Sequence, residues 1–348
     1  MTLIFGNTSI NQGGGQTINN QDIKITQDGV YTASEGYTGL GTVTVSTFDS
    51  YIMGNFPANI NSNVPSVGAY ALAYKSAVET ITLPNAVSMG SSALSNNDNL
   101  TSISLGSFTG STLDETTGHH DYTGYVNGLC TMDRALTSFS APNLQIIDDE
   151  FFSFINIGNS FTFNAPSLKG ITGNAFGSWD ASFPSPYQIT QNLGIDIADM
   201  KLLSIAGDLL EGYIEANSLT DTLTFNNLIT MGQGFTNTNR VQRNYLDNIT
   251  SLVVPNVKCI EDWCELNLPI ITLDLPSIMS IGGNALTYCS SLTTINVGSA
   301  ITEISPTAFI NLDGVTINID LPQPDAGDSS WKANAPWGAI NATINWIG

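Results

Sequence analysis

The stretch LTTINVGSAITEISPTAF, residues 292–309, contains one complete copy of a unit that recurs along the chain about every 22 residues. In its first half the apolar residues are spaced three and then two apart, and the last step has the period of a strand with one buried face. Gly298 ends this half. In the second half, two isoleucines three apart lead to the apolar pair 308–309, a spacing that predicts a short extended piece followed by one helical turn.

The strand half of the unit recurs along most of the chain and closes each time on a proline or a glycine, where a strand ladder tends to stop. Its other copies are ITLPN (81–85), SISLGS (102–107), SFSAPN (138–143), FNAPS (163–167), VVPN (253–256), LDLPS (273–277) and IDLPQ (319–323). No unit of this size can bury its apolar residues alone, so successive units must stack and share one core. We therefore expect about ten stacked units that form a rod on the order of 50 Å long.

The two-part unit resembles the BspA-like leucine-rich repeat, whose units read approximately L-x-x-I-x-[IL]-P-x-[SN]-[VI]-x-x-I-G-x-x-A-F. Residues 292–309 follow this pattern nearly position by position, and VETITLPNAVSMGSSAL, residues 78–94, does so as well. The resemblance implies an α+β solenoid, mostly β, and we assign residues 51–323 to this leucine-rich repeat rod.

Three stretches with extra residues interrupt the repeat, near 108–135, 177–201 and 233–248. We expect them to leave the solenoid as loops, and loops on a rigid scaffold are where recognition usually resides. Exposed Tyr and Trp side chains give a large contact area at little entropy cost and can stack on sugars. The candidate recognition residues are therefore the aromatic side chains of these loops: Tyr122, Tyr125, Trp179, Tyr187 and Tyr245. The alternative, that such side chains only pack their own loops, stays open for each of them.

The N-terminal region differs from the repeats. Residues 22–46, DIKITQDGVYTASEGYTGLGTVTVS, contain two alternating segments, IKIT and TVTVS, separated by turns at DG, EG and GLG. This stretch resembles a short β module that recurs in bacteriophage tail and other virion proteins and in prophage-encoded surface proteins. We assign residues 22–50 to a small all-β attachment module and residues 1–21, which are polar and glycine-rich, to an N-terminal arm.

The C-terminal residues 324–348 contain APWGAINATINWIG (335–348), in which a turn precedes an alternating strand. This segment resembles the closing segment of phage-encoded repeat proteins. A solenoid needs a cap because its last unit otherwise exposes apolar core and an unpaired edge. We expect a C-terminal capping strand segment in which Trp331, Trp337 and Trp346 form a hydrophobic lid; an aromatic ligand platform is the alternative.

The charge balance limits the classes of partner. Thirty acidic residues face nine basic ones, which gives a formal net charge of −21. Such a surface repels phosphate backbones and anionic lipid headgroups, so we expect no nucleic-acid partner. The first residues lack the pattern of a secretory signal, and no stretch approaches the roughly 18 apolar residues of a membrane span. We therefore expect neither membrane insertion nor export by the usual route.

Candidate chemistry is sparse. The acidic cluster 148–150 could suggest the carboxylate pair of a glycoside hydrolase, but its place before an apolar pair favours helix capping. His119 and His120, followed by Asp121, lie in one predicted loop, so we expect them neither to share a metal ion nor to complete a Ser-His-Asp arrangement. The cysteines are expected to be free thiols: Cys130, Cys259, Cys264 and Cys289. We predict no catalytic, metal-binding or cofactor-binding residue, and a protein that is not an enzyme.

Together these features predict a bacteriophage structural protein, a head or tail fibre or spike subunit that resides in the virion after assembly in the bacterial cytoplasm. We expect its N-terminal region to bind other virion proteins and its rod to bind a host cell-surface protein or glycan. Such subunits commonly form symmetric oligomers, so a homodimer or homotrimer is expected. The alternatives are a bacterial cell-surface adhesin with the same repeats and, third, a polysaccharide depolymerase.

Overall fold

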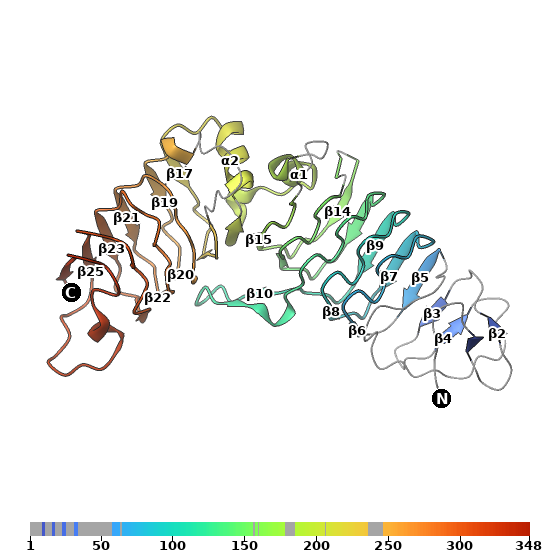
Figure 1. The fold of residues 1–348 in the computed structure, drawn as a ribbon, viewed down its shortest axis with the longest axis horizontal. Helices are drawn as coiled ribbons and strands as arrows, with labels where there is room; N and C mark the ends of the chain where they lie inside the picture. The colour runs from blue at the N-terminus through green and yellow to red at the C-terminus, as the bar shows by residue number, and fades with distance from the viewer. Residues whose placement is uncertain are drawn as a thin grey trace.

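The computed structural model describes residues 9–10, 16–17, 23–25, 31–33, 58–62, 65–155, 157–158, 160–177, 185–205, 207–235 and 246–348. They form a mostly β solenoid of about 11 turns with few helices, which confirms the predicted fold class. Figure 1 shows the solenoid as an arch that opens downward, with the N-terminal half on the right and the C-terminal half on the left.

The first half of each repeat unit forms one set of parallel strands. In the N-terminal part the sheet order is β14 (Thr162–Asn164), β12 (Ser138–Ser140), β9 (Ser102–Leu105), β7 (Thr80–Leu83), β5 (Asn59–Ser62), β3 (Ile23–Ile25) and β4 (Tyr31–Ala33). Toward the C-terminus, the same half forms β17 (Thr222–Thr224), β19 (Ser251–Val253), β21 (Thr272–Leu275), β23 (Thr294–Val297), β25 (Thr316–Ile319) and β26 (Thr343–Trp346). Every pair in this set is parallel except β3 with β4.

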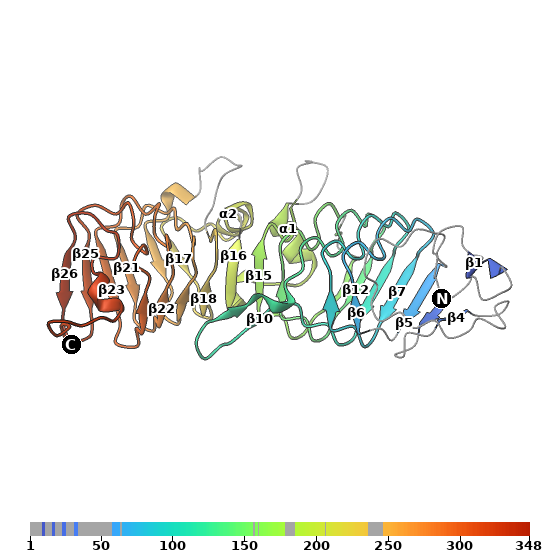
Figure 2. The same ribbon diagram turned by 60° about the horizontal axis from the view of Figure 1, so that its bottom comes forward.

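The second half of each unit forms the strands on the underside of the arch (Figures 1 and 2). The longer sheet has the order β13 (Ile146–Ile147), β15 (Gly170–Gly173), β16 (Leu202–Ile205), β18 (Thr230–Met231), β20 (Cys259–Ile260), β22 (Ser280–Ile281) and β24 (Glu303–Ile304). Near the N-terminus, β6 (Ser66–Val67) pairs with β8 (Ser88–Met89). All these pairs are parallel. We call the sheet that runs from β13 to β24 the concave sheet.

The apolar positions of the repeat face inward and stack in register. Ile103 of β9 lies opposite Ile81 on one side and Phe139 on the other, and all three are buried. Phe139 also meets Phe151 and Phe152 edge to face, with ring centroids 5.7 and 5.0 Å apart. Each turn therefore supplies one layer of a continuous core, as the periodicity predicts.

Asparagine side chains connect neighbouring turns in the C-terminal half. Asn296 donates from Nδ2 to Asp274 Oδ1 (2.6 Å), Asn318 donates to Asn296 Oδ1 (2.7 Å), and Asn345 donates to Asn318 Oδ1 (2.8 Å). These residues occupy one position of four strands that are paired in register. The ladder gives a structural reason for asparagine at this position of the repeat.

The described parts of the two ends continue the solenoid. β3, within the predicted attachment module, pairs in parallel with β5, and β4 closes that edge. In the predicted arm, β1 (Ser9–Ile10) pairs antiparallel with β2 (Gln16–Thr17). At the other end, β26 extends the last sheet, and buried Trp337 packs against Phe309, with Trp331 and Trp346 beside it.

The interruptions contain more regular structure than single loops. The second one forms helix α1 (Pro186–Asn192) and the 3-10 helix η2 (Ile197–Asp199), and Ser185 caps α1 by accepting a hydrogen bond from Gln188 N. A further helix, α2 (Gly207–Ala216), packs beside α1 and is not expected from the repeat, which predicts one helical turn per unit. Of the third interruption, 233–235 and the 3-10 helix η3 (Leu246–Asn248) are described. No helix in the described part of the chain is long and apolar enough to cross a membrane.

Candidate functional site

The first interruption forms a hairpin that lies along the concave sheet, and we call residues 110–126 the strap. Its strands β10 (Thr112–Leu113) and β11 (His120–Asp121) pair antiparallel and lead into the 3-10 helix η1 (Tyr122–Gly124). In Figure 2 the strap runs beneath β15 and β16 toward the strands of the C-terminal half. The strap is thus an ordered hairpin that bridges turns far apart in the sequence.

An apolar contact holds the strap against the sheet. Leu113 packs on Ile146 and Leu202, and these three buried side chains form a cluster separate from the main core. The parallel register places Ile146, Gly170 and Leu202 in one row across the concave sheet. In the following turns the row continues with Thr230, Cys259, Ser280 and Glu303. The row therefore carries large apolar side chains only where the strap covers it.

Lysines from three turns hold the part of the strap around Glu115. Lys169 Nζ lies 3.1 Å from Glu115 Oε1, and Lys201 Nζ contacts the other carboxylate oxygen. Lys258 Nζ donates to the backbone carbonyls of Glu115 (2.7 Å) and Thr116 (3.0 Å). Hydrogen bonds from Lys201 and Lys169 lower the pKa of the Glu115 carboxyl. Three of the nine basic residues of the chain thus contact the part of the strap at Glu115 and Thr116.

The strap tip contacts the sheet through its backbone. Thr230 Oγ1 donates to Gly118 O at 2.6 Å. Gly118 has a φ of +79°, and a Cβ there would lie 2.9 Å from Cys259 Cβ. Only glycine fits this left-handed position at such a close approach.

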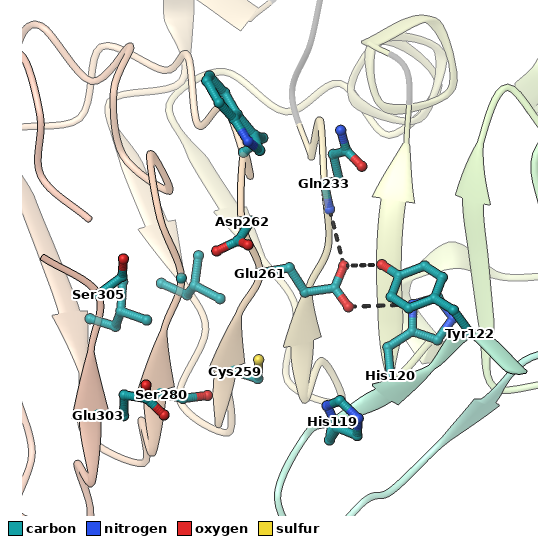
Figure 3. Close-up of a pocket in the computed structure, with 14 residues that line it drawn as sticks. His119, His120, Tyr122, Gln233, Cys259, Glu261, Asp262, Ser280, Glu303 and Ser305 are labelled. Carbon is teal, nitrogen blue, oxygen red and sulfur yellow. Dashed lines mark hydrogen bonds and ion pairs between the residues drawn. The ribbon is translucent and has the colours of Figure 1, made fainter. Parts of the chain in front are cut away.

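A buried polar chain crosses from the strap to both halves of the arch. Ser111 Oγ lies 2.6 Å from Asp148 Oδ1 and 3.0 Å from His120 Nε2. On the other side of the imidazole, Nδ1 lies 3.3 Å from Glu261 Oε1, within ion-pair distance but outside hydrogen-bond alignment. Tyr122 donates to Glu261 Oε2 at 2.9 Å. Figure 3 shows His120 and Tyr122 directed at this carboxylate.

The contacts Ser111–His120–Glu261 have the order of a nucleophile, a base and an orienting carboxylate. The sequence interpretation did not expect this, because it placed both histidines in one loop. Ser111 is fully buried, however, and its hydroxyl also faces Asp148, so a substrate cannot reach its oxygen in this conformation. We therefore assign the arrangement to holding the strap and not to nucleophilic catalysis.

The hydrogen positions among Asp148, Ser111 and His120 depend on whether Asp148 is protonated. If Ser111 donates to the ionised Asp148, its oxygen is left to accept from His120 Nε2. If Asp148 is protonated and donates to Ser111, the serine donates to Nε2, and a neutral ring keeps its hydrogen on Nδ1. The arrangement with a protonated Asp148 holds one proton more than two ionised carboxylates with a neutral imidazole.

Asp148 is the residue whose environment favours that proton. Burial raises the pKa of its carboxyl from 3.8 to about 6, and the hydrogen bonds from Ser111 and from Val126 N oppose the rise. The structure corrects the capping interpretation, because the Asp148 carboxylate accepts a hydrogen bond from Val126 N of the strap (3.0 Å). The carboxylate of its neighbour Asp149 accepts a hydrogen bond from Asn174 N of the next turn (2.6 Å).

A groove of about 640 Å³ opens where the strap ends (Figure 3). His119, His120 and Tyr122 of the strap line one side of it. Its lining also includes the small residues Cys259, Ser280, Gly282 and Ser305 from successive turns of the concave sheet. The groove exists because these turns carry small side chains beyond the reach of the strap.

Trp263 also lines the groove and sits in a strained backbone conformation. Its φ is +57°, in the left-handed region, and its side chain is 46% exposed. The same corner of the neighbouring turns holds Gly234 (φ 68°) and Asn284 (φ 55°), which tolerate this conformation. The same corner also has a positive φ at Tyr70 (58°) and Glu150 (54°) in earlier turns, so the conformation belongs to the repeat. The feature that matters at Trp263 is an exposed aromatic ring at the groove.

The groove is acidic. Glu261, Asp262 and Glu303 line it, and none of its described lining residues is Lys or Arg. Glu261 is engaged by the strap and by Gln233 N (3.2 Å), and Asp262 accepts a hydrogen bond from Gly283 N. The Glu303 carboxylate makes no hydrogen bond or ion pair with the described residues. Burial and the adjacent Glu261 raise the pKa of Tyr122.

The five predicted recognition residues have different places. Tyr122 lines the groove, and Tyr125 is 38% exposed with its ring centroid 6.2 Å from that of Tyr122. Tyr187 lies on α1 and packs edge to face on Tyr213 of α2, 6.3 Å between centroids, outside the groove. Trp179 and Tyr245 lie outside the described residues.

Sequence reasoning missed Trp263, Asp262 and Glu303. The available signal for Trp263 was a tryptophan at a repeat position that holds glycine in GQGF (232–235) and asparagine in GGNA (282–285). Among the described residues, no group of three or more His, Cys, Asp or Glu side chains could hold a metal ion. The four cysteines are unpaired, and burial raises the pKa of Cys259 to about 11.

The family described as "BspA type leucine rich repeat region" matches residues 42–116 and 215–329 in six copies, together more than half of the chain. The first matched range begins inside the predicted attachment module. Among solved structures, the chain is similar to the pneumococcal vaccine antigen PcpA at 13% identity and a TM-score of 0.34, covering 98% of this chain and 99% of that one. A leucine-rich cell surface protein from Faecalibacterium prausnitzii A2-165 is similar at 13% identity and a TM-score of 0.24, covering 95% and 89%. No curated protein sequence matches.

Proposed function

Since the chain belongs to the BspA-type leucine-rich repeat family, we propose that it is a binding protein whose solenoid presents the groove beside the strap to a macromolecular partner. The observation that carries the proposal is Trp263, an exposed aromatic side chain that lines an acidic groove. A tryptophan ring gives a large contact area at little entropy cost. Binding through such a side chain explains its presence better than folding does.

The setting that we propose is a bacteriophage particle, in which the protein is a head or tail fibre or spike subunit. Support comes from the resemblance of residues 22–46 to a β module of virion proteins. In this setting the N-terminal region attaches a homodimer or homotrimer to other virion proteins, and the groove binds a host-surface molecule. The same repeats would suit a bacterial cell-surface adhesin, and the experiments below separate the two.

Binding of the fluorescently labelled full chain to intact cells of the source bacterium and its close relatives tests the recognition role. We expect saturable binding that a Trp263→Asn/Glu303→Gln double variant loses. Glu79→Gln is the matched control, because Glu79 is exposed on a remote turn and the substitution removes one charge as Glu303→Gln does. Equal binding by all three proteins would contradict a recognition role for the groove.

Electron microscopy of whole particles, induced from a strain that carries the gene, tests the virion setting. We expect the arch in projections from the particle surface, in two or three copies per attachment point. Detection of the protein on the cell envelope of uninduced bacteria, with none in purified particles, would favour the adhesin instead. Light scattering of the purified chain checks the oligomer, and a monomer at micromolar concentration would contradict the fibre subunit.

A further inference from the structure

We infer that the groove binds a cationic side chain, arginine or lysine, presented by an extended segment of a partner protein. This inference rests on the proposed recognition function and specifies its ligand.

Charge at the groove favours a cation. Asp262 and Glu303 line it, and the Glu261 carboxylate next to them is already contacted by His120 and Tyr122. The described lining has no Lys or Arg that could form an ion pair with Asp262 or Glu303. The net charge of −21 adds a long-range attraction for a basic partner.

The aromatic side chains favour a cation that can stack on a ring, such as a planar guanidinium group. Trp263 is the best ring for a cation–π contact, and guanidinium groups use such rings more often than ammonium groups do. Tyr122 lies at the same groove, and its ring is half exposed. Trp263 and Glu303 line the same groove, so together they offer a basic segment an aromatic ring and a carboxylate.

The geometry of the lining suits an extended chain. Cys259, Ser280 and Glu303 occupy one register position of β20, β22 and β24, and these strands are neighbours in the concave sheet. The small side chains Ser280 and Ser305 leave room for a backbone and offer hydroxyls to it. A neutral glycan could use the same ring and hydroxyls, but it would gain nothing from the unpaired Glu303, which favours the basic peptide.

Titration of the full chain with fluorescein-labelled hexa-arginine in 150 mM salt tests the inference. Hexa-citrulline is the matched probe, since it has nearly the same shape and no charge. We expect hexa-arginine to bind and hexa-citrulline to show no saturable binding. Trp263→Asn should weaken binding about tenfold, Glu303→Gln about threefold, and Glu79→Gln less than about twofold.

Several outcomes would overturn the inference. An equal loss of affinity in Glu79→Gln and Glu303→Gln would mean that the peptide responds only to the overall charge of the protein. Unchanged affinity of Trp263→Asn would remove the aromatic contact, and preference for a neutral N-acetylglucosamine oligomer would make the groove a glycan site. Circular dichroism and thermal unfolding confirm that each variant is folded, and Asn284 at the neighbouring corner shows that asparagine is accommodated there.

The two proposals fail in different ways. If cell binding depends on the groove but hexa-arginine does not bind there, the recognition role stands and the ligand class is wrong. If hexa-arginine binds at the groove and no cell is bound, the ligand class stands and the proposed host-surface role falls.

Discussion

The substitution Asp148→Asn tests whether the buried chain at the strap holds its extra proton on this carboxyl. Burial raises the pKa of Asp148 from 3.8 to about 6, so the folded protein favours the protonated form. The stability from this group is fully present below the unfolded pKa and is lost as the pH rises through the folded pKa. Asparagine mimics the protonated acid, because it can donate to Ser111 and still accept from Val126 N, and it does not titrate.

The size of the effect follows from the two pKa values. Over the full range, a rise of about two pKa units corresponds to about 3 kcal/mol. Between pH 5 and pH 7.5, wild type should lose about 1.4 kcal/mol relative to Asp148→Asn. This window avoids the isoelectric point near 4.1, where the net charge vanishes. Comparison with the variant cancels the titration of the other carboxyl groups.

Urea unfolding of both proteins at the two pH values measures this difference, and hydrogen exchange of the strap amides locates it. As the pH rises, we expect the free energy of unfolding of the variant to increase relative to that of wild type. The faster hydrogen exchange of wild type should be confined to residues 110–126. A variant that is less stable than wild type by the same amount at both pH values would refute the reasoning. That result would mean that the Asp148 carboxyl does not change its protonation between these two pH values.

Further substitutions test the strap, the cap and the groove. Leu113→Ala should reduce the free energy of unfolding by about 2 to 3 kcal/mol in urea, because it uncovers the apolar patch on the concave sheet. Gly124→Ala should cost about 1 to 3 kcal/mol in the same assay, since a Cβ there would lie 2.1 Å from Gly110 O at the root of the strap. Trp337→Ala removes a fully buried side chain and should cost about 3 to 5 kcal/mol, with hydrogen exchange increasing first in the last turns. Trp263→Asn should leave stability unchanged or raise it by about 1 kcal/mol while hexa-arginine binding weakens about tenfold, and a clear loss of thermal stability would contradict the strain at this corner.

The repeat positions were predictable because each one depends on its neighbours at a nearly constant spacing. Ile81, Ile103 and Phe139 stack in register, and their spacing alone indicates a shared core. The strap was not predictable in the same way. Several of its contacts join residues far apart in the chain, such as Tyr122 with Glu261, 139 positions apart, and Lys258 with Glu115, 143 apart, and no local pattern encodes them.

One sequence signal did point to the strap. Ile146 and Leu202 stand at a repeat position that holds Thr230 and Ser280 in later turns. An apolar residue at an outward-facing position of a strand requires a cover, because exposing it to water is unfavourable. The substitution pattern within the repeat thus predicts that something covers these turns, although it does not identify residues 110–126 as the cover.

The groove is a consequence of the strap's length and not of the repeat. A uniform parallel sheet presents the same shallow surface at every turn, and it has no wall against which a ligand could be held. Tyr122 and His120 supply that wall, and their place is fixed by Glu261 on a distant turn. The buried chain that holds the strap and the acidic side of the groove therefore share one carboxylate. Release of the strap would remove the wall and uncover the apolar row at once, so binding at the groove should stabilise the strap by the same free energy that the docked strap adds to binding.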